Sequence, residues 1–382
     1  MDSRPQQTSA RMDALDGIRG LTIILVVLGH LWIVYPKESL DRFPIVRAVF
    51  NGGAVTMFFV IGGFIVTRNL LRENAEGRLD PFRFYLRRIV RLGVQLVPLA
   101  LAILVLARYD DTDTSDSSTT IRSVLSVLTF TWNNYLIDHA LEARSELGHL
   151  WYLSVQQQVY LAFPIAVLLL SRWRRALGLV FIAAGVGVII HRFVVLNGGP
   201  NSEWAASLST FTRADGLFLG AALACLAPWI PDRGAVNKHV ANGALVALGL
   251  LIALLPELGS QQYLREWSVV YVVVATLLVA AVTSKTQRAG FATTVLQRRT
   301  LVWLGNASLS LYVWHFPIFW TVSHHTPALT PLSRTFLSLG LLAAVTVISQ
   351  RFIEAPTRRW LRTSSLFRTP ALPTSEARAN VK

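Results

Sequence analysis

The chain has 382 residues and a net charge of +14; 53% of its residues are hydrophobic and only 15% are Asp, Glu, Lys or Arg. The mean hydropathy is +0.46, and the charged fraction is well below the roughly 25% of an average soluble domain. These two values exclude a string of soluble domains, a disordered chain and a collagen. The single cysteine, Cys225, excludes an internal disulfide framework. Lys and Arg gather at the ends of apolar stretches, so we expect them to orient the chain in a lipid bilayer and expect no nucleic-acid partner.

Ten apolar segments of about 20 residues run through the chain, each long enough to cross the hydrocarbon core of a membrane. They are residues 15–35, 49–69, 89–108, 150–171, 176–196, 205–229, 239–256, 267–284, 301–322 and 334–353. Backbone amides in lipid must be hydrogen-bonded within their own segment, so each segment is predicted to be a helix. The sequence therefore predicts an all-α, polytopic membrane helical bundle of about ten transmembrane helices.

The distribution of Lys and Arg between alternate connections predicts the orientation. Most of these residues lie in connections on the same side as the N-terminus, so we expect both termini in the cytoplasm of a multi-pass protein of the cell (plasma or inner) membrane. The predicted parts are a cytoplasmic N-terminal segment (1–14), a transmembrane domain (15–360) and a disordered cytoplasmic tail (361–382). No removable signal peptide is expected. A long outer connection, residues 109–148, is where an acceptor would be recognised.

The first apolar segment contains two ionisable side chains, Arg19 and His30. They are eleven residues apart, and because a helix turns by about 100° per residue, both project from one face, about 16 Å apart along the axis. Arg19 is expected either to extend toward the membrane surface or to serve the site. His30 is expected either to hydrogen-bond a neighbouring helix or to act as a general base that takes a proton from an acceptor hydroxyl.

Polar residues also mark the fourth and sixth segments. The fourth begins with GHLWYLSVQQQVYLAFP (148–164), in which Gln156 and Tyr160 share a helix face. These groups either join helices through hydrogen bonds or contribute to a site. In the sixth segment, Arg213 and Asp215 point in different directions on a helix and are not an obvious ion pair. A structural charge pair and a ligand contact both stay open for them.

The basic cluster RFYLRRIVR (83–91) is either a topology signal or a phosphate-binding group, because guanidinium forks match phosphate oxygens. No metal site is predicted. His30 and His149 lack a Cys or carboxylate partner at ligand spacing, and His324 and His325 form an isolated pair in an outer connection. The sequence contains no Gly-x-Ser-x-Gly elbow, no P-loop and no dinucleotide fingerprint.

These motifs occur in an order and spacing that resemble one known family. Along the chain they read LDGIRGLTIILVVLGH, MFFVIGGFIVT, FYLRRIVRL, GHLWYLSVQQQVYLAFP, FTRADGLFLGAAL, LGNASLSLYVWHFPI and FIEAPTRR. From Leu15 to Arg359 the chain resembles the integral-membrane acyltransferase 3 family, which modifies lipopolysaccharide, polysaccharides and macrolides. The resemblance implies transfer of an acyl group, often acetyl, from cytoplasmic acyl-CoA to a hydroxyl, commonly on a sugar at the outer face.

The resemblance also implies roles for individual residues. The family's arginine and histidine separated by ten residues fall on Arg19 and His30, and its further motifs match the residues Arg87, Arg88, Arg213, Asp215, His315 and Glu354. The chain departs from the family pattern at Gln156, where a glutamate is usual, and at Gly62 and Val94, where Ser and Pro are common. An amide at 156 keeps a hydrogen bond but supplies no negative charge.

We therefore expect an acyl-CoA-dependent membrane O-acyltransferase acting on a carbohydrate or glycosylated acceptor, with acyl-CoA as donor substrate and no bound cofactor. The expected catalytic residues are His30, Arg19, Gln156 and Tyr160. The expected substrate-binding residues are Arg87, Arg88, His149, Trp151, Ser154, Arg213, Asp215 and His315. Two alternatives stay open: a catalytically degenerate member that acts as a binding partner, because of Gln156, and a transporter of acyl groups or small molecules.

Overall fold

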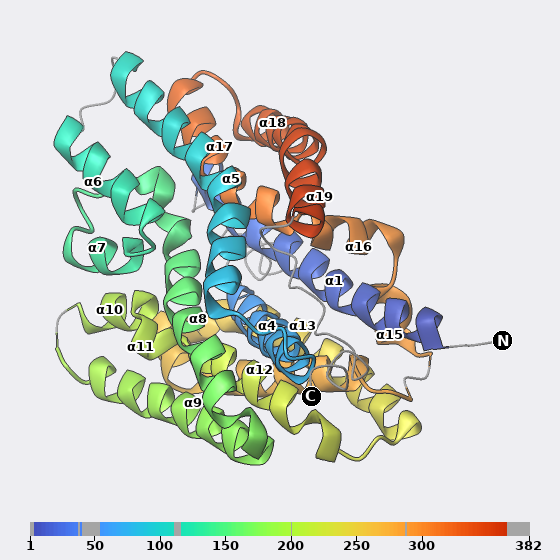
Figure 1. Ribbon diagram of the computed structural model, residues 1–382. Helices are drawn as coiled ribbons and strands as arrows, with labels where there is room; N and C mark the ends of the chain where they lie inside the picture. Colours follow the sequence, from blue (N-terminus) through green and yellow to red (C-terminus); the bar gives the residue numbers. More distant parts are fainter. Residues whose placement is uncertain are drawn as a thin grey trace, which may run out of the picture.

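The structure is a computed structural model that describes residues 4–36, 39, 54–110, 116–199, 201–286 and 289–364. Throughout these ranges the chain is helical, with no strand (Figure 1). The long helices are α1 (Arg4–Gly29), α4 (Val55–Ala75), α5 (Pro81–Tyr109), α8 (Trp151–Leu170), α9 (Arg174–Leu196), α12 (Asp215–Leu226), α13 (Gly234–Gln262), α14 (Ser268–Val282), α17 (Ser308–His325) and α18 (Pro331–Ser349).

Shorter helices complete the fold. They are α6 (Ser117–Leu128), α7 (Trp132–Asp138), α10 (Ser202–Leu208), α11 (Thr210–Arg213), α15 (Phe291–Leu296), α16 (Arg299–Asn306) and α19 (Ala355–Thr363). Two π-helical turns, Tyr263–Trp267 and Gln350–Glu354, precede α14 and α19. Figure 1 shows α6 and α7 together at one end of the molecule, beside the end of α5.

The predicted segments agree with the observed helices in part. Each of the ten overlaps one of the long helices, but length and hydropathy mark seven stretches as candidate membrane spans in the described residues. One of these, residues 145–196, contains both α8 and α9. The count of ten spans and the cytoplasmic placement of the termini stay predictions.

The sixth segment, 205–229, is not one helix as the sequence predicts. The backbone of Ser209 is extended, with φ −66° and ψ 140°, and its side chain accepts a hydrogen bond from the amide of Phe211, so the helix stops and begins again as α11. A second break at Ala214 separates α11 from α12. Arg213 and Asp215 therefore lie on either side of a helix break.

The boundaries of the predicted domain also differ from the helix ends. Helix α1 begins at Arg4, inside the expected N-terminal segment, and α19 continues to Thr363, past the expected start of the tail. Residues 365–382 of the predicted tail, 49–53 of the second segment and 111–115 of the outer connection lie outside the described residues. So do Lys37, Arg42 and Arg47, three basic residues of the connection between the first two segments, on the side opposite the N-terminus in the predicted orientation.

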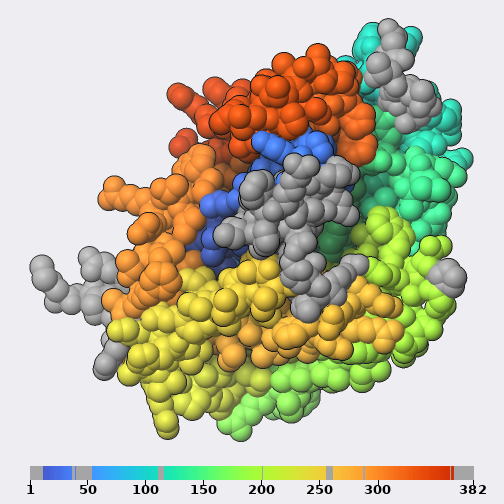
Figure 2. Space-filling model, turned by 180° about the vertical axis from the view of Figure 1, so that it is seen from behind, coloured from blue at the N-terminus to red at the C-terminus, as the bar shows by residue number. Residues whose placement is uncertain are grey.

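Helix α1 lies at the centre of the molecule. Its Ile23 and Val26 belong to one buried apolar cluster, shared with α5, α8 and α17, while its Leu15 and Ile18 belong to a second, shared with α4, α13 and α14. Figure 2 shows part of α1, in blue, between the orange C-terminal helices and the yellow region of α13. Residues on α1 therefore contact both halves of the helical bundle.

Glycines allow α1 to pack against α15 and α16 at backbone distance. A Cβ atom at Gly17 would overlap the carbonyl oxygen of Leu296, and one at Gly305 would overlap the carbonyl oxygen of Asp16. Small residues let helices in a membrane approach this closely, and the close packing replaces the hydrophobic driving force that lipid does not provide. The position of α1 is therefore set by its contact with α16.

We predict that Gly305→Ala separates α1 from α16, because the new methyl group overlaps backbone that has no side chain to rotate away. Such overpacking costs about 1–3 kcal/mol or more. The matched control is Gly340→Ala in α18, where an added Cβ meets nothing within 4 Å. Thermal unfolding of purified protein in detergent should show a lower midpoint for Gly305→Ala and an unchanged or higher midpoint for Gly340→Ala. Equal midpoints for the two variants would contradict the packing.

Candidate active site

A cavity that is open on one side lies between α1, α4, α5, α8 and the start of α17, and the empty space within it and at its mouth is about 840 Å³. Its polar lining residues are Arg19, Arg88, Arg91, Tyr152, Gln156, Tyr160, Ser308 and Tyr312. Apolar side chains, including Phe58, Ile65 and Leu153, form the rest of the wall. Among the described residues that line it none is acidic, so three guanidinium groups give the cavity a positive charge. Such a surface suits a molecule that carries phosphate groups.

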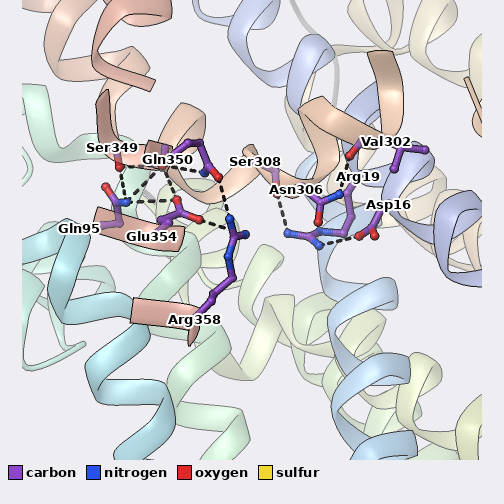
Figure 3. A network of polar contacts seen from close by, with 11 residues as sticks. Asp16, Arg19, Gln95, Val302, Asn306, Ser308, Ser349, Gln350, Glu354 and Arg358 are labelled. Atoms are coloured by element: carbon purple, nitrogen blue, oxygen red, sulfur yellow. Dashed lines mark hydrogen bonds and ion pairs between the residues drawn. The ribbon is translucent and has the colours of Figure 1, made fainter. Parts of the chain in front are cut away.

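Arg19 is partly buried and is held by two groups of the protein. Its Nη1 pairs with the Asp16 carboxylate at 2.9 Å, and its Nη2 donates to the Ser308 hydroxyl at 2.8 Å (Figure 3). Ser308 is the first residue of α17, so the guanidinium joins α1 to α17. The remaining face of Arg19 contributes to the cavity wall.

Arg88 is oriented by α8. Its guanidinium carbon lies 3.8 Å from the centroid of the Tyr160 ring, and its Nε donates to Gln157 Oε1 at 2.8 Å. A cation above an aromatic face is attracted by the electron-rich ring, which holds the arginine in place while its other nitrogens face the cavity. Helix α5, which carries Arg88 and Arg91, begins at Pro81 behind an N-cap by Asp80.

Two departures from the family pattern lie next to each other. Gln156 Nε2 donates to the Tyr152 hydroxyl at 2.8 Å. A Cβ atom at Gly62 of α4 would lie 2.9 Å from this same Nε2 and would overlap the Tyr160 hydroxyl. The absence of a side chain at 62 therefore makes room for the neutral amide at 156 and for the Tyr160 ring.

Three histidines from distant parts of the chain form one cluster. His30 follows α1, His149 belongs to the 3-10 helix Ser145–Leu150, and His315 lies within α17. His315 Nε2 lies 3.2 Å from His30 Nδ1, and the ring centroids of His149 and His315 are 5.0 Å apart. The Phe316 ring stacks on the His149 ring and forms a T-shaped contact with the His30 ring. The ring centroids are 5.1 Å apart in both cases. His149 and His315 are buried, and His30 is partly buried.

The cavity and the histidine cluster meet at two tyrosines. Tyr152 and Tyr312 line the cavity, with ring centroids 5.4 Å apart. The Tyr312 hydroxyl donates to the carbonyl oxygen of His149, and its ring lies 5.8 Å from the His315 ring. His30 itself is not a lining residue. Tyr312 therefore borders both the cationic cavity and the histidine cluster.

Arg213 and Asp215 do not pair with each other. Asp215 accepts a hydrogen bond at 2.9 Å from Arg192 of α9, and the side chains of this ion pair are only 4% and 0% exposed. The guanidinium carbon of Arg213 lies 5.5 Å from the centroid of the Trp151 ring and 5.9 Å from that of the Tyr263 ring. Asp215 therefore belongs to a buried ion pair with Arg192 and not with Arg213. Arg213 lies beside two aromatic rings instead.

Two further residues of the expected site lie elsewhere. Arg87 pairs with Glu73 of α4 at 2.9 Å, on the outside of the cavity, and the buried Ser154 is not among the lining residues. Arg87 is turned away because it precedes Arg88 by one position, about 100° around the helix. Ser154 is displaced in the same way from the face that carries Gln156 and Tyr160.

The structure reveals polar residues that the sequence analysis did not assign. Tyr152, Ser308 and Tyr312 line the cavity beside Arg91, and Arg192 neutralises Asp215. A hydrogen-bond network also joins α5 to α17, from Gln95 to Ser310. It continues to the end of α18 and to the turn and helix that follow, through Ser349, Gln350, Glu354 and Arg358 (Figure 3). Gln95 and Arg192 each lie inside an apolar helix, and a polar or charged side chain there indicates that it has a polar partner.

We predict that Asp215→Asn destabilises the protein strongly, because it leaves the buried Arg192 without a counter-charge. Removal of one partner of a buried pair costs about 3–5 kcal/mol. The control is Glu73→Gln, which breaks the partly exposed pair with Arg87 and should cost less than about 1 kcal/mol. Thermal unfolding and size-exclusion chromatography in detergent compare the two. If both variants unfold at the same temperature, Asp215 does not have this structural role.

Comparison with known proteins identifies the family. A family model described as an acyltransferase domain, acyltransferase 3, matches residues 12–350. Among the similar curated proteins are O-acetyltransferase OatA of Staphylococcus aureus, 27% identical over 374 residues, and the putative O-acetyltransferases SAS0844 and SAR0937 of the same species, 27% identical over 373 residues. Each alignment covers 91% of this chain and 57% of the relative, so the chain spans little more than half the length of these proteins. No solved structure matches the chain significantly. The match over most of its length shows that the chain belongs to the acyltransferase 3 family.

Proposed function

We propose that the protein is a cell-membrane O-acyltransferase that moves an acyl group, acetyl in the names of its relatives, from cytoplasmic acyl-CoA to a hydroxyl of a carbohydrate or glycosylated acceptor on the opposite side. The observation that carries this proposal is the arrangement along α1. Its Arg19 lies on a cationic cavity, and the chain that follows it places His30 in a cluster of histidines. This arrangement supports a donor with phosphates bound beside Arg19 and a proton acceptor just beyond the end of α1.

The cavity suits acyl-CoA as a donor substrate. Arg19, Arg88 and Arg91 offer guanidinium groups to its phosphates, and Arg88 is already held by Tyr160 and Gln157. The apolar wall suits the uncharged arm that carries the thioester. The donor is consumed in each reaction, so the proposal includes no bound cofactor.

His30 acts as the general base in this proposal. The acceptor hydroxyl loses its proton to His30 while its oxygen bonds to the thioester carbonyl carbon; the C–S bond breaks and the thiolate leaves. Tyr312 lines the cavity and contacts His149 and His315, and His315 in turn contacts His30. The thioester therefore reaches the base only when Tyr312 turns away from the His149 carbonyl.

The acceptor binds on the other side of the two tyrosines. Trp151 is partly buried and presents an aromatic face near Arg213, whose Nε has no hydrogen-bond partner among the described residues. An aromatic face and an arginine are suited to a sugar ring with polar substituents. Helices α6 and α7, from the connection expected on the outer side, lie near this end of α8.

We predict that His30→Ala abolishes acyl transfer and leaves the fold intact. Loss of a general base lowers the rate by about 10²–10⁴-fold. Membrane vesicles with the full-length protein receive radiolabelled acetyl-CoA, and label in the glycan fraction is compared with vesicles that lack the protein. His324→Ala, an exposed histidine on α17, serves as control and should retain activity. Undiminished transfer by His30→Ala would remove His30 from the reaction.

Gln156 favours a second candidate, a degenerate member that binds rather than transfers. We predict against it: the unaltered protein transfers acetyl groups, and Gln156→Glu changes the rate by less than about tenfold, because either side chain can hydrogen-bond the Tyr152 hydroxyl. Gln156→Leu, which loses this bond, serves as comparison. The same vesicle assay measures all three proteins. Activity that appears only in Gln156→Glu would establish the binding-partner function instead.

A further inference from the structure

The protons of His315 can be assigned from its partners. The ring lies fully buried in α17, and its Nδ1 is 3.1 Å from the carbonyl oxygen of Leu311 and 2.8 Å from that of Tyr312. Carbonyl oxygens only accept hydrogen bonds, so Nδ1 carries the proton. In a neutral imidazole the other nitrogen, Nε2, then has a free lone pair and accepts a hydrogen bond.

The same argument applies to His30. Its Nδ1 lies 2.8 Å from the carbonyl oxygen of Val26 and 3.2 Å from His315 Nε2. Both partners are acceptors, so His30 Nδ1 carries the proton and shares it between them. The lone pair of His30 is therefore on Nε2, the nitrogen that a general base must present to its substrate.

We propose that His315 is a positioning residue that fixes the tautomer and orientation of His30; this inference rests on the proposed function of His30 as the base. His315 Nε2 and the Val26 carbonyl occupy the position that a buried carboxylate holds in a Ser-His-Asp triad, where the third group orients the imidazole and stabilises its charged form. The Phe316 ring limits rotation of the His30 ring, because the two ring centroids are 5.1 Å apart in a T-shaped contact.

This role differs from the substrate contact that the sequence analysis expected for His315. Both of its nitrogens are already engaged by groups of the protein, and its side chain has no exposed surface. It therefore acts through His30.

The kinetic test compares His315→Leu with His315→Gln in the vesicle assay. We expect His315→Leu to lower kcat about 100-fold and to leave KM for acetyl-CoA within about twofold, because tautomer and orientation matter only in the chemical step. The amide oxygen of His315→Gln accepts from His30 Nδ1, so kcat should stay within about tenfold of the unaltered protein. His324→Leu is the matched control. Equal losses of kcat in the Leu and Gln variants would contradict the role.

The tautomer itself is measured without turnover. The chain has eight histidines, and ¹⁵N NMR of the full-length, histidine-labelled protein in lipid nanodiscs identifies the His30 signals by their loss in His30→Gln. We expect protonation at Nδ1 in the unaltered protein and in His315→Gln, and a larger fraction protonated at Nε2 in His315→Leu, where only the Val26 carbonyl still accepts from Nδ1. Protonation at Nε2, or an unchanged spectrum in His315→Leu, would overturn the inference. Failure of the proposed function shows separately, as activity that survives His30→Ala.

Discussion

The backbone contact between α1 and the pair α15 and α16 sets the geometry of the whole site. Gly17 and Gly305 allow it, since a side chain at either position would overlap a carbonyl oxygen of the neighbouring helix. This contact places Arg19 within reach of Ser308 at the start of α17, and His30 within reach of His315 on the same helix. Helices α1 and α17 are therefore joined at two places. Arg19 and Ser308 join them beside the cationic cavity, and His30 and His315 join them in the histidine cluster.

Each charge inside the bundle has a physical reason to be there. A charged side chain at the centre of a membrane costs at least about 2.5–3.5 kcal/mol. Arg192 and Asp215 offset this cost by pairing with each other, Arg19 by its contact with Asp16, and Arg88 by stacking on Tyr160. The buried Arg192–Asp215 pair does not line the cavity, whereas Arg19, Arg88 and Arg91 do. That difference separates a structural role from a binding role.

Features that depend on residues close together in the sequence could be predicted from the sequence alone. Apolar length predicted the helices, whereas helix α1 ends at Gly29, so the helical periodicity that was extended from Arg19 to His30 does not reach His30. The sequence was insufficient for contacts between distant residues: Arg19 meets Ser308 from 289 positions away, His315 meets His30 from 285, and Arg192 meets Asp215 from 23. The break at Ser209 was also missed, because one extended residue in an apolar run changes neither hydropathy nor length. His315 was singled out by its motif, but its role emerged only from the carbonyl groups around it.

The most direct test of the account is a structure of the full-length protein in nanodiscs with a non-reactive acyl-CoA analogue bound. The account predicts phosphate oxygens in contact with Arg88 and Arg91, the arm of the donor along the apolar wall, and the carbon that replaces the thioester carbonyl past a displaced Tyr312, near His30 Nε2. An analogue bound outside the cavity, or one whose reactive end stays on the cavity side of Tyr312 in every class of particles, would contradict it.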